Sequence, residues 1–570
     1  MTFLDASSVS RLLREFGRRV ALRPGNPYRA KAYARAADSL LALSVPLRDV
    51  IAQDRLQEIP GVGEAIADII TQLHKTGTHP TLEAMREEVP ESVLELLSIP
   101  GLRPDKVLKL HTDLGITSLA ELEGAARAGR LRKVKGLGAA LESKILKGID
   151  MRRHAQGSRH LHRAAELLQA AEWHLREANA AIVRVTAAGE FRRGCELVRE
   201  LTLVAEVRSS GNVSQRITES EELTVHLTDA RHYGVTLLHA TGSSAHLDEL
   251  RALAMERDML LEESGLRRGR RIVAAATEEK IYAALGLPLI PPELREGRGE
   301  IARALAGRLP VLVTDEDIRG ILHAHTDRSD GADTLEAMAE ATRARRYAYF
   351  GVADHSKSAH YAGGLSVEEI KEQHAKIDEL NRHYRGGFHV LKGIESDILP
   401  DGSLDYPEEI LRQFDFVVAS VHGRFKLDRK DQTERVLRAV ANPHTTILGH
   451  MTGRQLLRRP GYDIDVEKVL AACAEHGVAV EINANPWRLD LDWRWHEKAL
   501  ELGCMMSINP DAHSTRELDL THWGVEMARK GGVPKQRVLN CFSFDELEAH
   551  LRKRKANRRK TRRSRPELAA

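Results

Sequence analysis

Short apolar runs alternate with longer amphipathic stretches from Ile318 onward. Most of the runs are too short and too uniformly apolar for an amphipathic helix, whereas a strand that is buried on both faces has this pattern. Strands that alternate with helices predict βα units, and we expect them to form a parallel barrel. The candidate strands are residues 320–322, 347–353, 388–394, 414–420, 445–449, 478–482 and 505–508.

Residues that commonly bind metals follow six of these seven runs. The carboxyl ends of barrel strands are where active sites are built. A single loop histidine is more often a hydrogen-bonded residue than a ligand, but candidates at six strand ends predict one shared metal centre. Mixed imidazole and carboxylate ligands suit Mn²⁺, Zn²⁺ or Fe²⁺ better than Mg²⁺ or Ca²⁺. The nine candidates are His323, His325, Asp330, His355, Glu395, His422, His450, Asp511 and His513.

A different pattern repeats near the N-terminus, where an apolar residue precedes a glycine-containing turn and a helix. It occurs at 59–70 (IPGVGEAIADII), 99–110 (IPGLRPDKVLKL) and 134–146 (VKGLGAALESKIL). Glycine permits positive φ, and the free amides at the start of the next helix can face a phosphate. The repeats look like helix-hairpin-helix motifs, which hold a DNA backbone without reading its sequence. The expected DNA-binding residues are Gly61, Gly63, Gly101, Gly136 and Gly138; the second copy has Arg103 in place of its second glycine.

The composition indicates a multidomain chain. With 570 residues it exceeds one ordinary core, and its 29% charged and 42% hydrophobic residues fit soluble globular domains. No apolar run has the length of a membrane span, and the N-terminus lacks the core of a signal peptide, so we expect a cytoplasmic protein. The four cysteines are far apart and form no Cys-x-x-Cys pair, which argues against a disulfide framework and a zinc finger.

Charge is distributed unevenly along the chain. The segment Arg552 to Arg565 has ten basic residues and no acidic one, and without it the net charge of +3 becomes −7. A run of this kind is typical of a disordered tail, and it can add nonspecific affinity for nucleic-acid phosphates.

The order of motifs resembles the family X DNA polymerases of bacteria and archaea along nearly the whole chain. Supporting stretches are NPYRAKAYARAADSL (26–40), GEFRRGCELVREL (189–201), ATGSSAHLDELRALA (240–254) and GEIARALAGRLPVLV (299–313). The resemblance implies an all-α helix-hairpin-helix region, an α+β nucleotidyltransferase-like polymerase core and a C-terminal α/β phosphoesterase domain. That last domain would be a distorted (β/α)7 barrel of the polymerase and histidinol phosphatase (PHP) class. The implied domains are an N-terminal domain (1–85), fingers (86–150), palm (151–230), thumb (231–315), PHP domain (316–551) and basic tail (552–570).

The resemblance also identifies residues that are missing from the polymerase centre. In the family, an Asp-x-Asp pair after a Gly-Ser-x-Arg-Arg motif and a third aspartate hold two metal ions for nucleotidyl transfer. The corresponding positions here are Glu200, Thr202 and His226. One glutamate does not assemble a two-metal centre, and imidazole is a poor ligand for Mg²⁺. We therefore expect an inactive polymerase core that serves as a DNA-binding scaffold.

Two further points concern the polymerase half. The alternative to an inactive core is a rearranged centre that recruits Asp229 or Glu206. The lyase activity of the family needs a lysine nucleophile, and Ile69 stands at that position in our alignment. Lyase activity is therefore not expected.

The ligand set of the PHP class is complete in this sequence. The resemblance implies one ion held by His323, His325, Glu395 and Asp511, a second held by Glu395, His422 and His450, and a third held by Asp330, His355 and His513. Glu395 and Asp511 would be catalytic through these two or three ions, with Mn²⁺ favoured. Arg424 and Arg454 follow strands four and five, and we expect them to bind phosphate oxygens.

The sequence thus favours a DNA repair protein in which the PHP domain hydrolyses DNA phosphoesters, as a 3′-5′ exonuclease or in 3′-end processing, with gapped or 3′-ended duplex DNA as the partner. Three alternatives stay open. A small-molecule phosphomonoesterase of the histidinol phosphatase type would not need a DNA-binding region. A gap-filling polymerase would need a working Glu200. A purely structural DNA-binding factor would leave nine metal-ligand residues unexplained.

Overall fold

The computed structural model describes residues 4, 6–23, 27–41, 47–59, 61–97, 99, 102–155, 157–208, 215–220 and 223–563. The chain divides into two compact units. The first comprises residues 1–156 with 457–459, and the second comprises 157–456 with 460–570. Each unit is described by itself. Among the described residues, none of the helices combines the length and apolar character that a membrane span requires.

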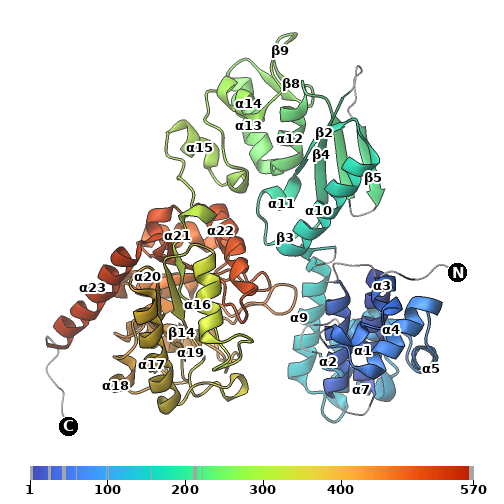
Figure 1. Ribbon diagram of the computed structural model, residues 1–570. Helices are drawn as coiled ribbons and strands as arrows, with labels where there is room; N and C mark the ends of the chain where they lie inside the picture. The colour runs from blue at the N-terminus through green and yellow to red at the C-terminus, as the bar shows by residue number, and fades with distance from the viewer. Residues whose placement is uncertain are drawn as a thin grey trace. The chain divides into compact units, whose positions relative to one another are not determined.

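The first unit is helical and has two apolar cores (Figure 1). Phe16, Tyr33 and Leu73 are buried in the first core, and Leu110 and Leu122 are buried in the second. The helices around the first core are α1 (Ala6–Leu22), α2 (Pro27–Leu41), α3 (Leu47–Ala52), α4 (Glu64–Thr76) and α5 (Pro80–Glu88). Those around the second are α6 (Glu91–Leu96), α7 (Pro104–Leu114), α8 (Leu119–Arg127) and α9 (Ala139–Ala155).

The second unit begins with residues 157–241, which overlap the implied palm (151–230) and are called the palm segment below. Its four-stranded sheet has the order β2-β4-β6-β5, in which β4 and β6 are parallel and the outer pairs are antiparallel. Buried Leu203, Val204 and Ala205 make β4 the centre of the segment's core. The elements are β1 (Arg159–His160), α10 (Leu161–Ala178), β2 (Ile182–Ala187), α11 (Gly189–Arg192), β3 (Leu197–Val198), β4 (Leu201–Val207), β5 (Gln215–Ser220), β6 (Leu223–Thr228) and α12 (Tyr233–Thr241).

The thumb segment, residues 242–315, combines helices with a small antiparallel sheet. Glu278 is buried and pairs with Arg192 of the palm segment at 2.7 Å and with Arg295 at 2.5 Å. The Arg192 pair connects the two segments, and the Arg295 pair lies within the thumb segment. The elements are α13 (Ser244–Glu256), β7 (Leu260–Glu262), β8 (Gly265–Arg268), β9 (Arg271–Ala274), α14 (Glu278–Ala284) and α15 (Glu300–Leu305).

The PHP segment, residues 316–563, contains a strand in each of the seven predicted runs. The strands are β10 (Gly320–Ile321), β11 (Tyr349–Val352), β12 (His389–Lys392), β13 (Glu395–Asp397), β14 (Val418–Ser420), β15 (Ile447–Leu448), β16 (Ala479–Asn483) and β17 (Met506–Asn509). All neighbouring strands are parallel, in a three-stranded sheet β10-β11-β12 and a five-stranded sheet β13-β14-β15-β16-β17. The segment is therefore the predicted parallel α/β structure.

The third predicted strand is split in two. It ends at Lys392, and β13 begins at Glu395; between them Gly393 lies so close to Phe416 that a Cβ would clash. Two isolated parallel bridges join the two sheets, one from His355 to Glu395 and one from Ala324 to Ala512. These bridges connect the first sheet to both ends of the second, which is the connectivity that a barrel requires.

Helices surround these strands in the PHP segment (Figure 1). They are α16 (Leu335–Ala344), α17 (Val367–Tyr384), α18 (Glu408–Leu411), α19 (Arg429–Ala441), α20 (Val466–His476), α21 (His496–Leu502), α22 (Thr521–Lys530) and α23 (Phe544–Arg563). The last helix corrects the expectation of a disordered basic tail. Leu547 and Leu551 of α23 are buried in an apolar cluster, and the helix continues from this anchor through the basic stretch as far as Arg563.

Candidate metal centre

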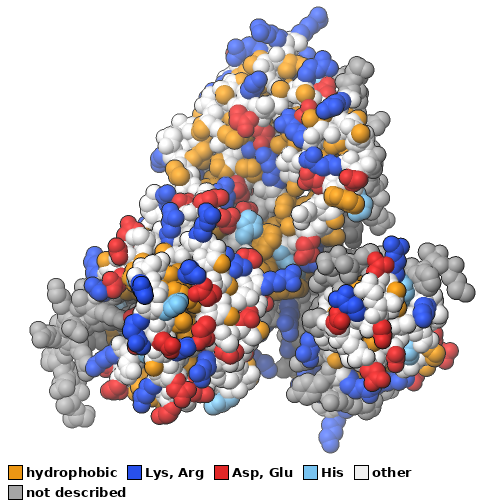
Figure 2. Space-filling view, viewed as in Figure 1, with side chains coloured by type: hydrophobic (Ala, Val, Ile, Leu, Met, Phe, Trp, Pro, Cys, Tyr) orange, Lys and Arg blue, Asp and Glu red, His pale blue; other side chains and the backbone are white. Residues whose placement is uncertain are grey.

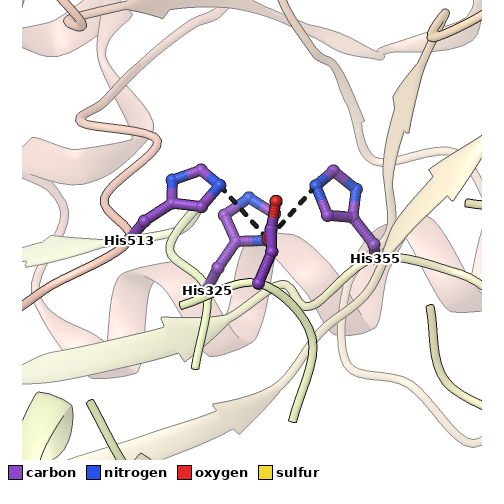
Figure 3. Close-up of side chains that lie close together, drawn as sticks. His325, His355 and His513 are labelled. Carbon is purple, nitrogen blue, oxygen red and sulfur yellow. Dashed lines mark ion pairs between the residues drawn. The ribbon is translucent and has the colours of Figure 1, made fainter. Parts of the chain in front are cut away.

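The nine predicted ligands converge at the carboxyl ends of the parallel strands. His325, His355 and His513 face one another (Figure 3), and the Asp330 carboxylate lies 3.5 Å from His355 Nε2 and 3.3 Å from His513 Nε2. Ligand atoms of these four residues all lie within 4.8 Å of one another, a spacing that one ion can bridge. The group joins residues from three separate strand ends.

Glu395 lies at the centre of the remaining ligands. Its two carboxylate oxygens face different imidazoles, as expected of a carboxylate that bridges two ions. The distances from Oε1 are 3.0 Å to His450 Nε2, 3.3 Å to His422 Nε2 and 3.4 Å to His323 Nε2, and Oε2 lies 2.9 Å from His355 Nδ1.

Asp511 completes a third group. Its Oδ1 is 3.1 Å from His325 Nε2 and 3.6 Å from His323 Nε2. The groups share members, because His325 also belongs to the Asp330 group and His355 also lies next to Glu395 and His422. The structure thus brings all nine residues together, and the partition of ligands among individual ions stays a prediction.

The chemistry of the site fits divalent metal ions. His323, His325 and Glu395 are almost completely buried, yet His323 Nε2, His325 Nδ1 and Glu395 Oε2 have no hydrogen-bond partner. A buried polar atom without a partner is costly, and these atoms face the cluster. A metal ion would satisfy all of them.

The charges around the site favour ionised carboxylates. Burial would raise the pKa of Glu395, but His422, His323 and His355 lower this pKa well below the usual value. Burial would likewise raise the pKa of Asp511, which His323 and His325 lower. Burial and its histidine neighbours lower the pKa of His325 to about 3, so this imidazole is neutral and ready to coordinate.

Outer residues orient the ligands. Glu481 Oε1 lies 2.6 Å from His323 Nδ1, and Glu481 Oε2 accepts the backbone N–H of His450 at 2.7 Å. Asp397 Oδ1 lies 2.6 Å from His422 Nδ1. A carboxylate on the second ring nitrogen fixes the tautomer of a metal-bound imidazole. Sequence reasoning missed both carboxylates, although an acidic residue inside the apolar run 478–482 was a visible signal.

The structure places the two predicted arginines differently. Arg454 is largely buried and donates to Asp492 Oδ2 at 2.8 Å and to the carbonyl of Arg488 at 3.1 Å, so it binds the loop after β16. Arg424 is exposed. A third arginine was missed: Arg488 Nε lies 3.7 Å from Asp511 Oδ2. The sequence has no predicted ligand at the end of strand six, so no local signal pointed to an arginine in the loop that follows it.

The three polymerase positions do not lie in a comparable cluster. Glu200 is exposed before β4, Thr202 is buried on β4, and His226 on β6 is registered with Val204. The acidic residues of the alternative centre have other partners. Glu206 pairs with Arg184 at 2.6 Å, and Asp229 accepts the backbone N–H groups of Arg231 and His232. Within the described part of the palm segment, no group of three potential ligands is found.

The glycine hairpins of the first unit share one backbone geometry. Gly61 and Gly136 have φ values of +82° and +88°, which only glycine adopts readily. Gly63 and Gly138 precede α4 and α9, with open space where a Cβ would be. In each of the three repeats a backbone N–H donates to the carbonyl oxygen three residues earlier, at 3.0 Å. The donors are Val62, Leu102 and Leu137. Gly101 lies outside the described residues.

A second basic surface lies on the thumb segment. The turn between β8 and β9 carries the exposed residues Arg268, Arg270 and Arg271. Lys and Arg side chains gather at this tip in Figure 2. Such a cluster attracts phosphate groups.

Family models match four parts of the chain. They are a helix-hairpin-helix domain (residues 6–79), a SAM-like helix-hairpin-helix tandem (93–150), a DNA polymerase beta thumb (236–296) and a PHP domain (322–485). The last range contains seven of the nine candidate ligands, and Asp511 and His513 follow it.

Curated relatives match either nearly the whole chain or a part of it. The DNA polymerase/3′-5′ exonuclease PolX of Bacillus subtilis (strain 168) is 33% identical over 575 residues, which cover 96% of this chain and 100% of that protein. A "probable phosphatase" of Thermoanaerobacter sp. (strain X514) is 30% identical over 179 residues, 30% of this chain and 70% of that protein. Another, of Acetivibrio thermocellus, is 28% identical over 249 residues, 41% of this chain and 95% of that protein. The chain therefore belongs to the PolX family, with helix-hairpin-helix domains, a DNA polymerase beta-type thumb and a PHP domain on one polypeptide.

Proposed function

We propose that the PHP segment is a metal-dependent phosphoesterase that shortens DNA from 3′ ends during repair. The observation that carries the proposal is the convergence of nine imidazole and carboxylate side chains at six strand ends. A catalytic phosphoesterase needs such a site, and a purely structural DNA-binding factor does not.

Two or three divalent ions, with Mn²⁺ favoured over Zn²⁺ or Fe²⁺, fit these ligands. When bound, such ions lower the pKa of a coordinated water and stabilise the charge that develops on the phosphate oxygens. Hydrolysis then adds water to phosphorus, breaks the P–O3′ bond and releases a nucleoside 5′-monophosphate from the shortened strand. Glu395 and Asp511 would hold the ions, and Glu395 would be shared between two of them.

The arginines take different roles in this proposal. Arg488 pairs with the proposed ligand Asp511 at 3.7 Å, and Arg424 is exposed after strand four, so we propose both as residues that bind phosphate oxygens. Arg454 acts through the loop: its hydrogen bonds to the carbonyls of Arg488 and Leu489 fix the backbone that carries Arg488. We therefore propose Arg454 as a positioning residue.

The palm segment serves as a scaffold in this proposal and not as a polymerase. Nucleotidyl transfer by two metals needs clustered carboxylates. Support comes from the exposed position of Glu200, the neutral Thr202 and the pairing of Glu206 with Arg184. The helix-hairpin-helix glycines, the arginines of the β8–β9 turn and the basic end of α23 would hold the DNA backbone. The proposed domain boundaries stay at residues 85, 150, 230, 315 and 551; the segments named above group whole structural elements, so α12 is described with the palm segment although it follows residue 230.

A second candidate function is hydrolysis of a small phosphomonoester. The similarity of the PHP segment to proteins called probable phosphatases favours it. This activity would not need the first unit. Faster hydrolysis of a free phosphate monoester than of an oligonucleotide would support it.

The test uses the full-length protein with Mn²⁺ and a 5′-labelled gapped duplex, with and without dNTPs. We expect stepwise shortening of the labelled strand and no extension. The His323→Ala/His325→Ala double variant should not shorten the strand. Extension by the wild type would overturn the scaffold role of the palm segment. If the wild type neither shortens nor extends the strand, the proposal of a DNA phosphoesterase is rejected.

A further inference from the structure

Two exposed aromatic side chains lie on loops that contact the candidate metal centre. Three aromatic residues in the described part of the chain are largely exposed: Trp173 (60%), Tyr361 (71%) and Trp487 (54%). The Tyr361 ring centroid lies 6.2 Å from that of His355. Trp487 precedes Arg488, whose Nε lies 3.7 Å from Asp511 Oδ2. One exposed apolar residue needs no explanation, but two rings beside one polar site indicate a contact surface.

Hydrogen bonds tie the backbone of Trp487 to the ligand cluster. Asn483 Nδ2 donates to Asp511 Oδ2 at 3.1 Å, and Asn485 N donates to Asn483 Oδ1 at 3.2 Å. Trp487 N then donates to Asn485 Oδ1 at 3.1 Å. The position of Trp487 is therefore fixed relative to a proposed metal ligand.

The palm segment holds the indole ring itself. The rings of His160 and His162 lie edge-on to Trp487, with centroids 4.3 Å and 5.3 Å away. His160 is also anchored, because its Nε2 lies 3.2 Å from the Leu456 carbonyl oxygen. More than half of the Trp487 surface nevertheless stays open to solvent. A ring that is oriented on one side and open on the other is arranged to stack on a flat ligand.

Tyr361 combines an open ring with a polar end. It lies in the 3₁₀ turn His360–Ala362, on the loop that follows β11. Its ring lies against His355 on one side and is 71% exposed. The open face of the ring is therefore available to a flat ligand beside the ligand cluster.

We infer that Tyr361 and Trp487 bind nucleobases at the 3′ end of a single strand and seat the adjacent phosphodiester at the metal centre. This inference rests on the proposed function and names its substrate class, an unpaired nucleotide terminus and not a base-free phosphate ester. Stacking on aromatic rings is tolerant of sequence, because every base has a π face. An enzyme that shortens DNA of any sequence needs this kind of contact.

The test compares two 5′-labelled single-stranded oligonucleotides that differ only at the 3′-terminal nucleotide, which carries a base in one and is a tetrahydrofuran abasic unit in the other. Trp487→Ala and Tyr361→Ala should each lower kcat/KM for removal of the base-bearing nucleotide by about tenfold, within the range for loss of one stacked base. Both variants should remove the abasic nucleotide at the wild-type rate. Trp487→Phe, which keeps a ring, should retain most of the activity.

Trp173→Ala is the matched control, because Trp173 is equally exposed but lies on α10 and contacts His174. It should behave as the wild type on both substrates. Equal losses on both substrates in the alanine variants, or wild-type rates on both, would overturn base stacking. Metal content and thermal unfolding of each variant identify any loss caused by misfolding. A wild-type protein that degrades neither oligonucleotide rejects the proposed function itself, and the stacking role with it.

Discussion

The palm and PHP segments both carry polar residues on adjacent parallel strands, but only one of them gathers metal ligands. On β4 and β6, Thr202 is registered with Thr224 and Val204 with His226, so this face has no carboxylate pair. In the PHP segment, strand ends bring Glu395 and Asp511 within 3.7 Å of the same imidazole, His325. A metal centre is therefore recognised by convergence of side chains and not by the number of acidic residues.

The surroundings of the acidic residues differ in the same way. Burial of a carboxylate is costly unless a charge partner or a metal compensates it. The palm acids Glu206 and Asp229 have partners within their own segment, Arg184 and the Arg231–His232 backbone. Glu395 is buried with one oxygen that has no hydrogen-bond partner. The palm acids are thus compensated by neighbouring groups of the protein, whereas a bound ion would compensate the partnerless oxygen of Glu395.

The largest expected effect comes from Glu395→Gln. An amide in place of the shared carboxylate removes the charge that holds two ions, so nuclease activity should fall by about 10³-fold or more, beyond the 10–100-fold typical of outer residues. The bound-metal content should fall with it, as measured by elemental analysis of the purified protein. Glu379→Gln, at an exposed position on α17, is the control and should leave both values unchanged. An active Glu395→Gln variant would mean that the PHP segment, like the palm segment, has no metal centre that depends on a shared carboxylate.

Glu278→Gln tests how much the buried ion pairs of Glu278 contribute to the stability of the palm and thumb segments. The change leaves Arg192 and the fully buried Arg295 without a charge partner, and the loss of a buried ion pair costs about 3–5 kcal/mol of unfolding free energy. Thermal denaturation of the full chain measures this loss. The exposed neighbour Glu279→Gln should have little effect. A stable Glu278→Gln variant would mean that the contact between palm and thumb segments contributes little.

The ionisation of Glu278 should also make the stability of the fold depend on pH. Burial would raise the pKa of Glu278, but Arg192 and Arg295 lower it below the usual value. A lowered pKa contributes stability that is present above the ordinary carboxyl pKa and is lost as pH falls through the folded-state pKa. Acid should therefore destabilise the wild type more than the Glu278→Gln variant. Unfolding midpoints compared at neutral and acidic pH measure the difference.

Glu481→Gln should have a smaller effect on the metal centre. Glu481 touches the ligand His323 and not a substrate, so the change should weaken metal binding by about 10–100-fold. Titration of the metal-free protein with Mn²⁺ measures this affinity, and excess Mn²⁺ should restore nuclease activity. Glu475→Gln, exposed on α20, is the control. Activity that stays low at saturating Mn²⁺ would show that Glu481 does more than orient an imidazole.

Sequence periodicity and residue type predicted where the strands and the candidate ligands lie. They did not predict which residues surround those ligands. The apolar runs and the histidines after them are local signals, which need no knowledge of tertiary contacts. Arg454 and Arg488 show where local signals end: both follow strands, but only the fold determines that Arg454 binds the loop and that Arg488 reaches Asp511. The helical conformation of the basic stretch was also not predicted, because it depends on the burial of Leu547 and Leu551, which anchors α23.

The smallest expected effect comes from Glu200→Ala, which tests whether the palm segment lacks a catalytic metal centre. Glu200 is exposed and has no place in a ligand cluster of the described palm segment, so its removal should change neither DNA shortening nor thermal stability. Primer extension on a gapped duplex with Mn²⁺ and dNTPs should be absent from both the wild type and the variant. Extension by the wild type that Glu200→Ala abolishes would mean that Glu200 holds a catalytic metal with the help of DNA or nucleotide. The palm segment would then be a second active centre that assembles only on its substrate, while the PHP centre is built from its own side chains before substrate binds.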